Sequence, residues 1–141
     1  MKRFVLLFMF IMLSSLAFTD GFKTEQDCRS FSDKLMDHFI NTNFQEGLNS
    51  TKPYWPIPEI EIDGLTNQIK QQWPIVDRRF GKAIAKEFIS EKRIGKSFLR
   101  YYYLHKFENH SIYWRIDFYK PHEEWIINSI IFLDKLDPLF E

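Results

Sequence analysis

Two neighbouring stretches in the last third of the chain carry side chains that could bind a polar ligand or transfer a proton. Alternate positions hold phenols, a guanidinium and a carboxylate along 111–120, and phenols and an imidazole along 95–108. The candidate residues are Tyr113, Arg115, Asp117 and Tyr119 in the first stretch, and Tyr101, Tyr103 and His105 in the second. Around one cavity, this set could bind the polar head of an otherwise apolar ligand. It could also perform general acid–base catalysis, with Asp117 or His105 as the base and a tyrosine hydroxyl as the oxyanion donor.

The same pattern is also compatible with a surface that has no site. A solvent-facing sheet would show an Arg115–Asp117 ion pair and cross-strand aromatic pairs, and the opposite face, with Trp114 and Phe118, makes the better core. Asn128 adds a further candidate, because it lies in an isoleucine-rich stretch. It is either a buried amide directed at a ligand or a hydrogen-bonded structural amide.

The remaining nucleophiles and metal-ligating residues form no recognisable motif. Cys28 is the only cysteine, which excludes an internal disulfide, and we expect it to pack as a small hydrophobe in a helix. An intermolecular disulfide or a nucleophilic role stays open as the alternative. His105, His110 and His122 are too scattered for a metal site. We therefore predict neither a metal nor a cofactor.

Residues 1–17 have the pattern of a signal peptide. Lys2 and Arg3 precede an apolar stretch at 4–13, and the small residues Ser15 and Ala17, on either side of Leu16, suit a cleavage site after Ala17. The apolar stretch is too short to span a bilayer as a mature helix, although an uncleaved N-terminal anchor is the alternative. We therefore predict an exported domain of residues 18–141, periplasmic or extracellular, with no membrane contact after cleavage.

Charge and length narrow the class of protein. The chain has 141 residues and an even balance of 19 basic and 19 acidic residues, from which the signal peptide removes only Lys2 and Arg3. The mature net charge is therefore −2, which does not favour nucleic acid or an anionic membrane surface as a partner. The length suits one domain with its own core.

Helical patterns precede the candidate stretches. Thr24 is a suitable N-cap for a helix over about 25–41 with one apolar face. Prolines between 43 and 58 indicate a loop. A second helix is predicted from about Glu59 to Phe80, with a kink or break at Pro74 and a stop at Gly81.

The candidate stretches themselves are predicted to be strands. Three strands over 95–108, 111–120 and 124–134 are separated by connections short enough for hairpins. The segment 82–93 is ambiguous, because its propensity favours a helix while its apolar residues also recur with period two.

The layout of two helices followed by a long antiparallel sheet resembles the nuclear-transport-factor-2-like superfamily, the cystatin-like α+β roll. The resemblance extends over about 25–136 and is similar to the pattern of small exported bacterial members. It is carried by Gly81 and by the segments 94–101, 106–108, 114–115, 118–121 and 125–128.

This resemblance implies an α+β fold with two N-terminal helices packed on a curved antiparallel meander of about four strands, and it assigns 82–93 to a strand. Members of the superfamily use the cone between the helices and the concave sheet in different ways. Some are isomerases or cyclases that act on small hydrophobic molecules, and many bind ligands or proteins without chemistry. We therefore expect a non-catalytic module that binds a small hydrophobic ligand or a protein partner. The alternatives are a small enzyme of the isomerase or cyclase kind and a homodimer formed through the sheet.

Overall fold

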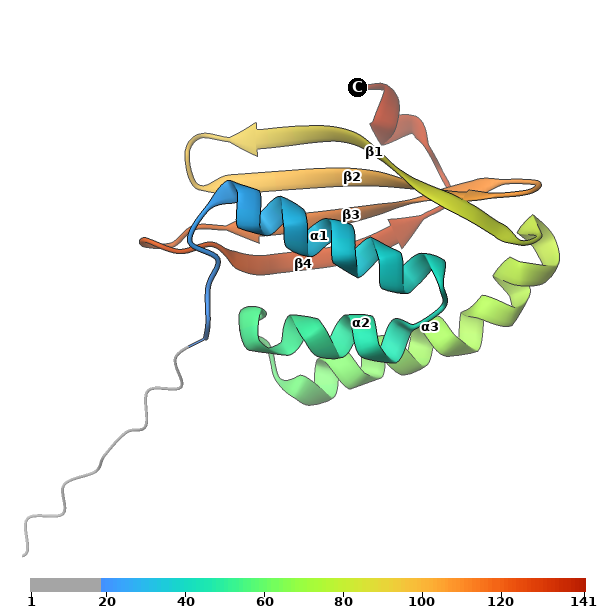
Figure 1. Ribbon diagram of the computed structural model, residues 1–141, viewed down its shortest axis with the longest axis horizontal. Helices are drawn as coiled ribbons and strands as arrows, with labels where there is room; N and C mark the ends of the chain where they lie inside the picture. The colour runs from blue at the N-terminus through green and yellow to red at the C-terminus, as the bar shows by residue number, and fades with distance from the viewer. Residues whose placement is uncertain (1–18) are drawn as a thin grey trace, which may run out of the picture.

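The computed structural model describes residues 19–141, so the predicted signal peptide lies outside the described residues. The helices are α1 (Glu25–Ile40), α2 (Phe44–Thr51) and α3 (Glu59–Phe80). The strands are β1 (Ala83–Ile94), β2 (Phe98–Phe107), β3 (Ser111–Tyr119) and β4 (Ile126–Leu133), and short 3₁₀ turns lie at Lys52–Tyr54 and Asp137–Phe140. Figure 1 shows the four strands side by side, with α1 against one face and with α2 and α3 on the side of β4.

The predicted α+β class and the four-stranded antiparallel meander are confirmed, with strand order β1-β2-β3-β4. The ambiguous segment 82–93 is a strand, as the resemblance implied. It pairs with β2 along its length, and the register shifts on either side of Ile84 and of Ile89. These bulges explain the mixed sequence pattern, because each extra residue interrupts the period-two alternation.

The structure has three α-helices where two were predicted. The segment 43–58, predicted to be a loop, contains α2. The prolines of this segment all follow Thr51, so the eight residues Phe44–Thr51 are free to form a helix of about two turns. Gly47 lets α2 approach α1 closely, since a Cβ there would lie 3.0 Å from the Cβ of His38.

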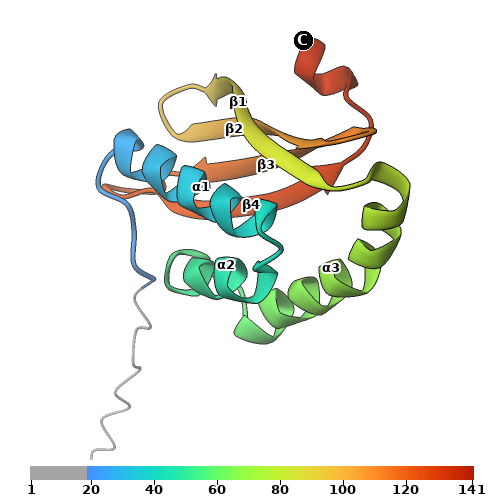
Figure 2. The same cartoon turned by 45° about the vertical axis from the view of Figure 1, so that its right-hand side comes forward.

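The first and third helices follow the predicted boundaries closely. Thr24 caps α1, because its hydroxyl accepts from the Asp27 N–H at 3.1 Å while the Asp27 carboxylate accepts from the Thr24 N–H at 3.3 Å. α3 continues through Pro74 without a break and is bent, so that its first half lies below β4 and its second half rises to β1 (Figures 1 and 2). The predicted kink is therefore a bend within one helix.

The core lies between the helices and the inner face of the sheet. Trp114 of β3 is fully buried at its centre, where its ring stacks on Phe39 of α1 at 4.2 Å between centroids. Phe44 of α2 and Trp73 of α3 meet edge-on at 4.5 Å and extend the same aromatic layer. The three helices that cover β3 are thus joined to it and to one another through aromatic rings.

Candidate functional site

The sheet places the predicted site residues on two opposite faces. Tyr101 and Tyr103 pair with Ile116 and Trp114, and these four side chains point toward the helices. Asp117 and Arg115 pair with Arg100 and Tyr102 on the outer face. Tyr101, Tyr103 and His105 therefore form an inner group, and Tyr113, Arg115, Asp117 and Tyr119 form an outer group. They do not surround one cavity, because a β-sheet separates alternate residues by its full thickness.

The inner group belongs to the core. The Tyr103 hydroxyl donates to Asp33 Oδ1 at 2.6 Å, and the Tyr101 hydroxyl donates to the Glu25 main-chain oxygen at 3.3 Å. Burial raises the pKa of both phenols. Each hydroxyl therefore stays protonated and ties β2 to α1.

His105 is fully buried and neutral. Its Nδ1 accepts from Trp114 Nε1 at 3.1 Å, which places the imidazole proton on Nε2. Nε2 has no hydrogen-bond partner among the described residues. Burial lowers the pKa of His105 to about 4. At neutral pH this residue acts as the acceptor that orients Trp114.

The outer group is an ion-paired surface around Asp117, which is almost completely buried. Arg100 holds the carboxylate with two hydrogen bonds, Nε to Oδ1 at 2.9 Å and Nη2 to Oδ2 at 3.0 Å. Ser129 Oγ donates to Oδ2 at 2.9 Å, and Arg115 Nε lies 3.3 Å from the same oxygen. Because the carboxylate is buried and both of its oxygens accept hydrogen bonds, a ligand on the outer face has no direct access to it.

Arg100 is the partner that sequence reasoning missed. The pattern along 111–120 suggested Arg115 as the partner of Asp117, because both lie on the same strand face. Arg100 is directly opposite Asp117 on β2, and it forms the bidentate pair. Knowledge of the β2–β3 register would have identified it.

The remaining members of the predicted set lie apart. Tyr113 is buried and packs edge-on against Tyr102 at 5.7 Å between centroids, whereas Tyr119 is 41% exposed at the end of β3. Asn128 is exposed at a bulge, since the β3–β4 register shifts between Asp117 and Phe118. The bulge turns this amide to the surface, so it is not the buried amide that the sequence suggested.

Cys28 is buried in α1 with no disulfide partner among the described residues. Burial raises the pKa of its thiol to about 12. Since the thiolate is the nucleophilic form, this thiol is inert at neutral pH.

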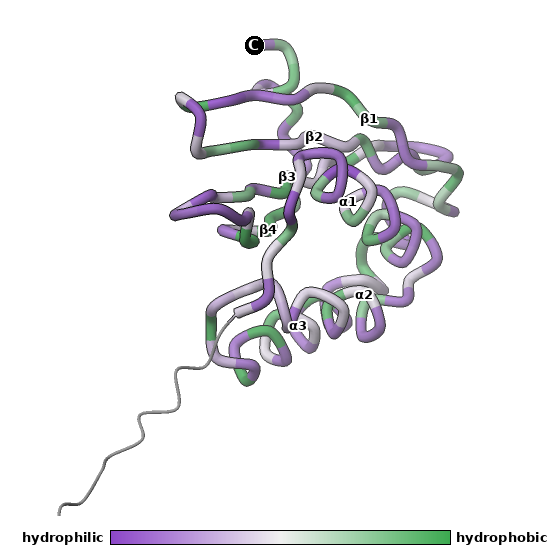
Figure 3. Tube along the Cα trace, turned by 60° about the vertical axis from the view of Figure 1, so that its left-hand side comes forward, coloured by the Kyte–Doolittle hydropathy of each residue, from purple (hydrophilic) through white to green (hydrophobic). Residues whose placement is uncertain are grey.

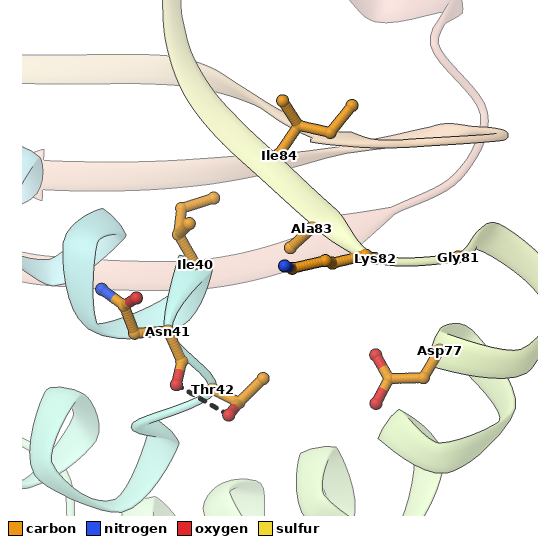
Figure 4. Close-up of a pocket in the computed structure, with 8 residues that line it drawn as sticks. All are labelled: Ile40, Asn41, Thr42, Asp77, Gly81, Lys82, Ala83 and Ile84. Carbon is orange, nitrogen blue, oxygen red and sulfur yellow. Dashed lines mark hydrogen bonds between the residues drawn. The ribbon is translucent and has the colours of Figure 1, made fainter.

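One opening is a polar cleft between the end of α1 and the turn that joins α3 to β1, with a volume of about 570 Å³. Asp77 and Lys82 extend toward it from α3 and from the turn (Figure 4). The Thr42 hydroxyl donates to the Asn41 main-chain oxygen at 2.7 Å, and the Asn41 amide donates to the Asp37 oxygen at 2.9 Å. Asp77 and Lys82 are exposed to solvent, and Asn41 and Thr42 are already hydrogen-bonded at the end of α1. These four side chains therefore do not form a preorganised binding site in the cleft.

A smaller, apolar opening lies between α3 and β4. We call it the α3–β4 slot; its volume is about 180 Å³. Leu65, Gln68 and Ile69 line it from α3, and Ile130, Ile131 and Phe132 line it from β4. Trp114 forms its inner end. The lining carries no charge, and the Gln68 side chain is its single polar group.

The inner end of the slot is held rigidly. The Trp114 ring is stacked on Phe39, lies 4.8 Å from Phe132 between centroids, and donates to His105. Sequence reasoning missed the slot because its two walls are separated along the chain by the whole of β1, β2 and β3. The apolar residues of α3 and of the last strand gave no signal that they face each other.

Among residues 19–141, no helix is long and apolar enough to cross a membrane. Within the same residues, no cluster of three or more His, Cys, Asp or Glu side chains is placed to hold a metal ion. Comparison of the chain with protein-family models, with curated proteins and with solved structures gives no match.

Proposed function

We propose that this chain is an exported, non-catalytic binding module of the nuclear-transport-factor-2-like type, and that the α3–β4 slot receives an apolar group of its target. The observation that carries the proposal is the uncharged lining of the slot around the fixed ring of Trp114. Binding pockets are mostly apolar concavities with few polar groups, and this opening has that character. Export is supported by the pattern of residues 1–17, and the fold type by the helix–sheet layout.

The size of the slot limits what can enter it. Sites for drug-sized ligands occupy roughly 300–1,000 Å³, whereas apolar cavities of about 150 Å³ bind benzene-sized molecules. At about 180 Å³, the α3–β4 slot suits one aromatic ring or one branched aliphatic group. A large lipid or steroid body would need α3 to move away from β4.

A binding role is favoured over catalysis by the positions of the acid–base groups. His105 is enclosed in the core and Asp117 is held by Arg100 on the other face of the sheet. Neither residue lines the slot. A proton-transfer reaction needs a titratable group within hydrogen-bonding reach of the substrate, and the slot presents only an amide.

Toluene is a suitable probe for this proposal, because it matches the volume of the slot. We expect saturable binding, detected by NMR as chemical-shift changes of the methyl groups of Leu65, Ile69 and Ile130. Leu65→Trp should fill the mouth of the slot and abolish the changes at Ile69 and Ile130. Ile75→Trp is the matched control, since Ile75 is an exposed aliphatic residue of the same helix outside the slot. Shifts that are absent in the parent protein, or that persist in Leu65→Trp, would contradict the proposal.

A further inference from the structure

The free edge of β4 lies directly beside the α3–β4 slot. Among the described residues, β4 pairs only with β3, and its other edge makes no backbone hydrogen bond. The strand has eight residues and contains no charge and no proline. Natural proteins usually protect such an edge with charges, prolines or a covering segment, because its unpaired N–H and C=O groups can pair with another chain.

The start of this strand already accepts an antiparallel partner from within the chain. Phe22 and Trp125 exchange two main-chain hydrogen bonds of 2.8 Å, immediately before Ile126. Gly21 permits this approach, because a Cβ there would lie 2.5 Å from the Cβ of Glu124. The N-terminal segment then leaves the strand, since the Asp20 N–H bonds to the Pro53 oxygen at 2.9 Å. The pairing begun at Trp125 is therefore not continued along β4.

The position of α3 determines the kind of partner that fits. In Figures 1, 2 and 3, the first half of α3 lies beyond β4, on the side away from β3. A strand added to β4 would therefore lie against α3, and α3 has to move outward from β4 to admit its backbone, because the slot between the two elements has a volume of only about 180 Å³. Side chains alternate between the two faces of a strand, so every second one would point toward the slot. A second copy of this chain would bring its own α3 into the same space, which favours a single peptide strand.

We infer that the free edge of β4 and the α3–β4 slot together bind an extended peptide segment of a partner protein. The segment pairs antiparallel with β4 and inserts one uncharged aromatic or branched aliphatic side chain between α3 and β4. In strand addition of this kind, main-chain hydrogen bonds provide affinity and pockets for alternate side chains provide specificity. The inference rests on the proposed function, because both assign the slot to an apolar group.

The test uses N-acetylated, C-amidated heptapeptides of threonine with a central Phe, Leu or Val. Binding should protect main-chain amides of β4 from hydrogen exchange and should shift the methyl groups of Ile69 and Ile130. N-methylation of alternate peptide bonds, which keeps the side chains and removes donors, should weaken binding by about tenfold or more. A central Asp should weaken binding by a similar factor, because the slot carries no charge to pair with it.

Three results would overturn the inference in distinguishable ways. If toluene enters the slot but none of the three peptides protects β4, the strand-addition inference fails and the apolar-group proposal survives. If neither toluene nor any peptide binds, both fail. If β4 amides become protected with rising protein concentration alone, together with dimer formation in sedimentation, a second copy occupies the edge and the peptide assignment is wrong.

Discussion

The two edges of the sheet differ in almost every property that controls strand pairing. β1 carries charged residues along its length, namely Lys86, Glu87, Glu91, Lys92 and Arg93, and it is bulged at Ile84 and Ile89. β4 carries no charge, and isoleucines dominate it. Charges and bulges are the usual means by which an edge strand avoids a partner, so β1 is closed to pairing and β4 is open to it. The contrast identifies β4 as the edge at which strand addition can be tested.

The helices beside these edges differ in the same way. α1 is fixed to β1 by polar contacts: Lys86 Nζ donates to the Asp33 oxygen at 2.7 Å, and Arg93 pairs with Glu25. No side-chain hydrogen bond or ion pair joins α3 to β4 within residues 19–141. The two elements meet through apolar side chains instead, as in the Trp73–Phe132 ring pair at 6.3 Å between centroids. Hydrogen bonds and ion pairs therefore hold α1 against β1. Only apolar packing holds α3 against β4, and an apolar ligand can replace that packing.

The largest expected effect compares how much the inner end and the mouth of the slot contribute to the free energy of unfolding. Trp114→Ala should lower the free energy of unfolding by about 3–5 kcal/mol, because it opens a cavity at the centre of the core. Leu65→Ala, at the half-buried mouth, should cost only about 1 kcal/mol. Urea denaturation at pH 7 measures both. Equal losses would show that the mouth is as tightly packed as the core, which would remove the basis for a ligand there.

A second prediction concerns pH, because the Trp114 ring at the inner end of the slot is hydrogen-bonded to a buried titratable group, His105 of β2. The pKa of His105 is about 4 in the folded chain, against about 6.5 when unfolded. The unfolded chain therefore takes up a proton at a higher pH than the folded chain, and stability falls as the pH drops from about 6.5 to about 4, by about 3 kcal/mol in total.

His105→Asn provides the matched control for this prediction. Its amide oxygen can accept the Trp114 hydrogen bond at the position of Nδ1, but the residue does not titrate. Urea denaturation at several pH values measures the free energy of unfolding of the parent and of the variant. As the pH drops from about 6.5 to about 4, the parent should lose about 3 kcal/mol more than the variant does. Parallel pH profiles would show that the imidazole is not buried as a neutral group.

These comparisons also show what local sequence information can predict. The strands at 98–107, 111–119 and 126–133 were predicted with the bounds 95–108, 111–120 and 124–134, because alternation and short turns are local signals. The helix at 44–51 was missed because the prolines that follow it dominated the pattern. The Arg100–Asp117 pair and the α3–β4 slot were missed because they depend on strand register and on contacts between distant elements, which a single sequence does not encode locally.

A third, smaller effect tests the hydrogen bond that holds the sheet against α1. Tyr103→Phe removes the hydroxyl that donates to Asp33 Oδ1 and should lower the free energy of unfolding by about 1 kcal/mol. Tyr119→Phe is the matched control, because that tyrosine is 41% exposed and makes no hydrogen bond among the described residues. It should leave the urea midpoint unchanged. If both substitutions are neutral, the hydroxyl does not contribute to fixing β2 against α1.

The smallest effect on stability is expected when a charged residue is introduced into β4, as charged residues occur in β1. Leu133→Lys places a charge on the open strand at a 47% exposed position of its outer face, outside the lining of the slot, where the lysine stem can lie along the sheet and the ammonium can reach water. The unfolding free energy should fall by about 0.5 kcal/mol, while binding of the phenylalanine heptapeptide should be lost. Ile94→Lys, at the 71% exposed end of β1, should change neither quantity. Because the two variants add the same charge to opposite edges, equal peptide binding by both would mean that the absence of charge on β4 has no role in recognition.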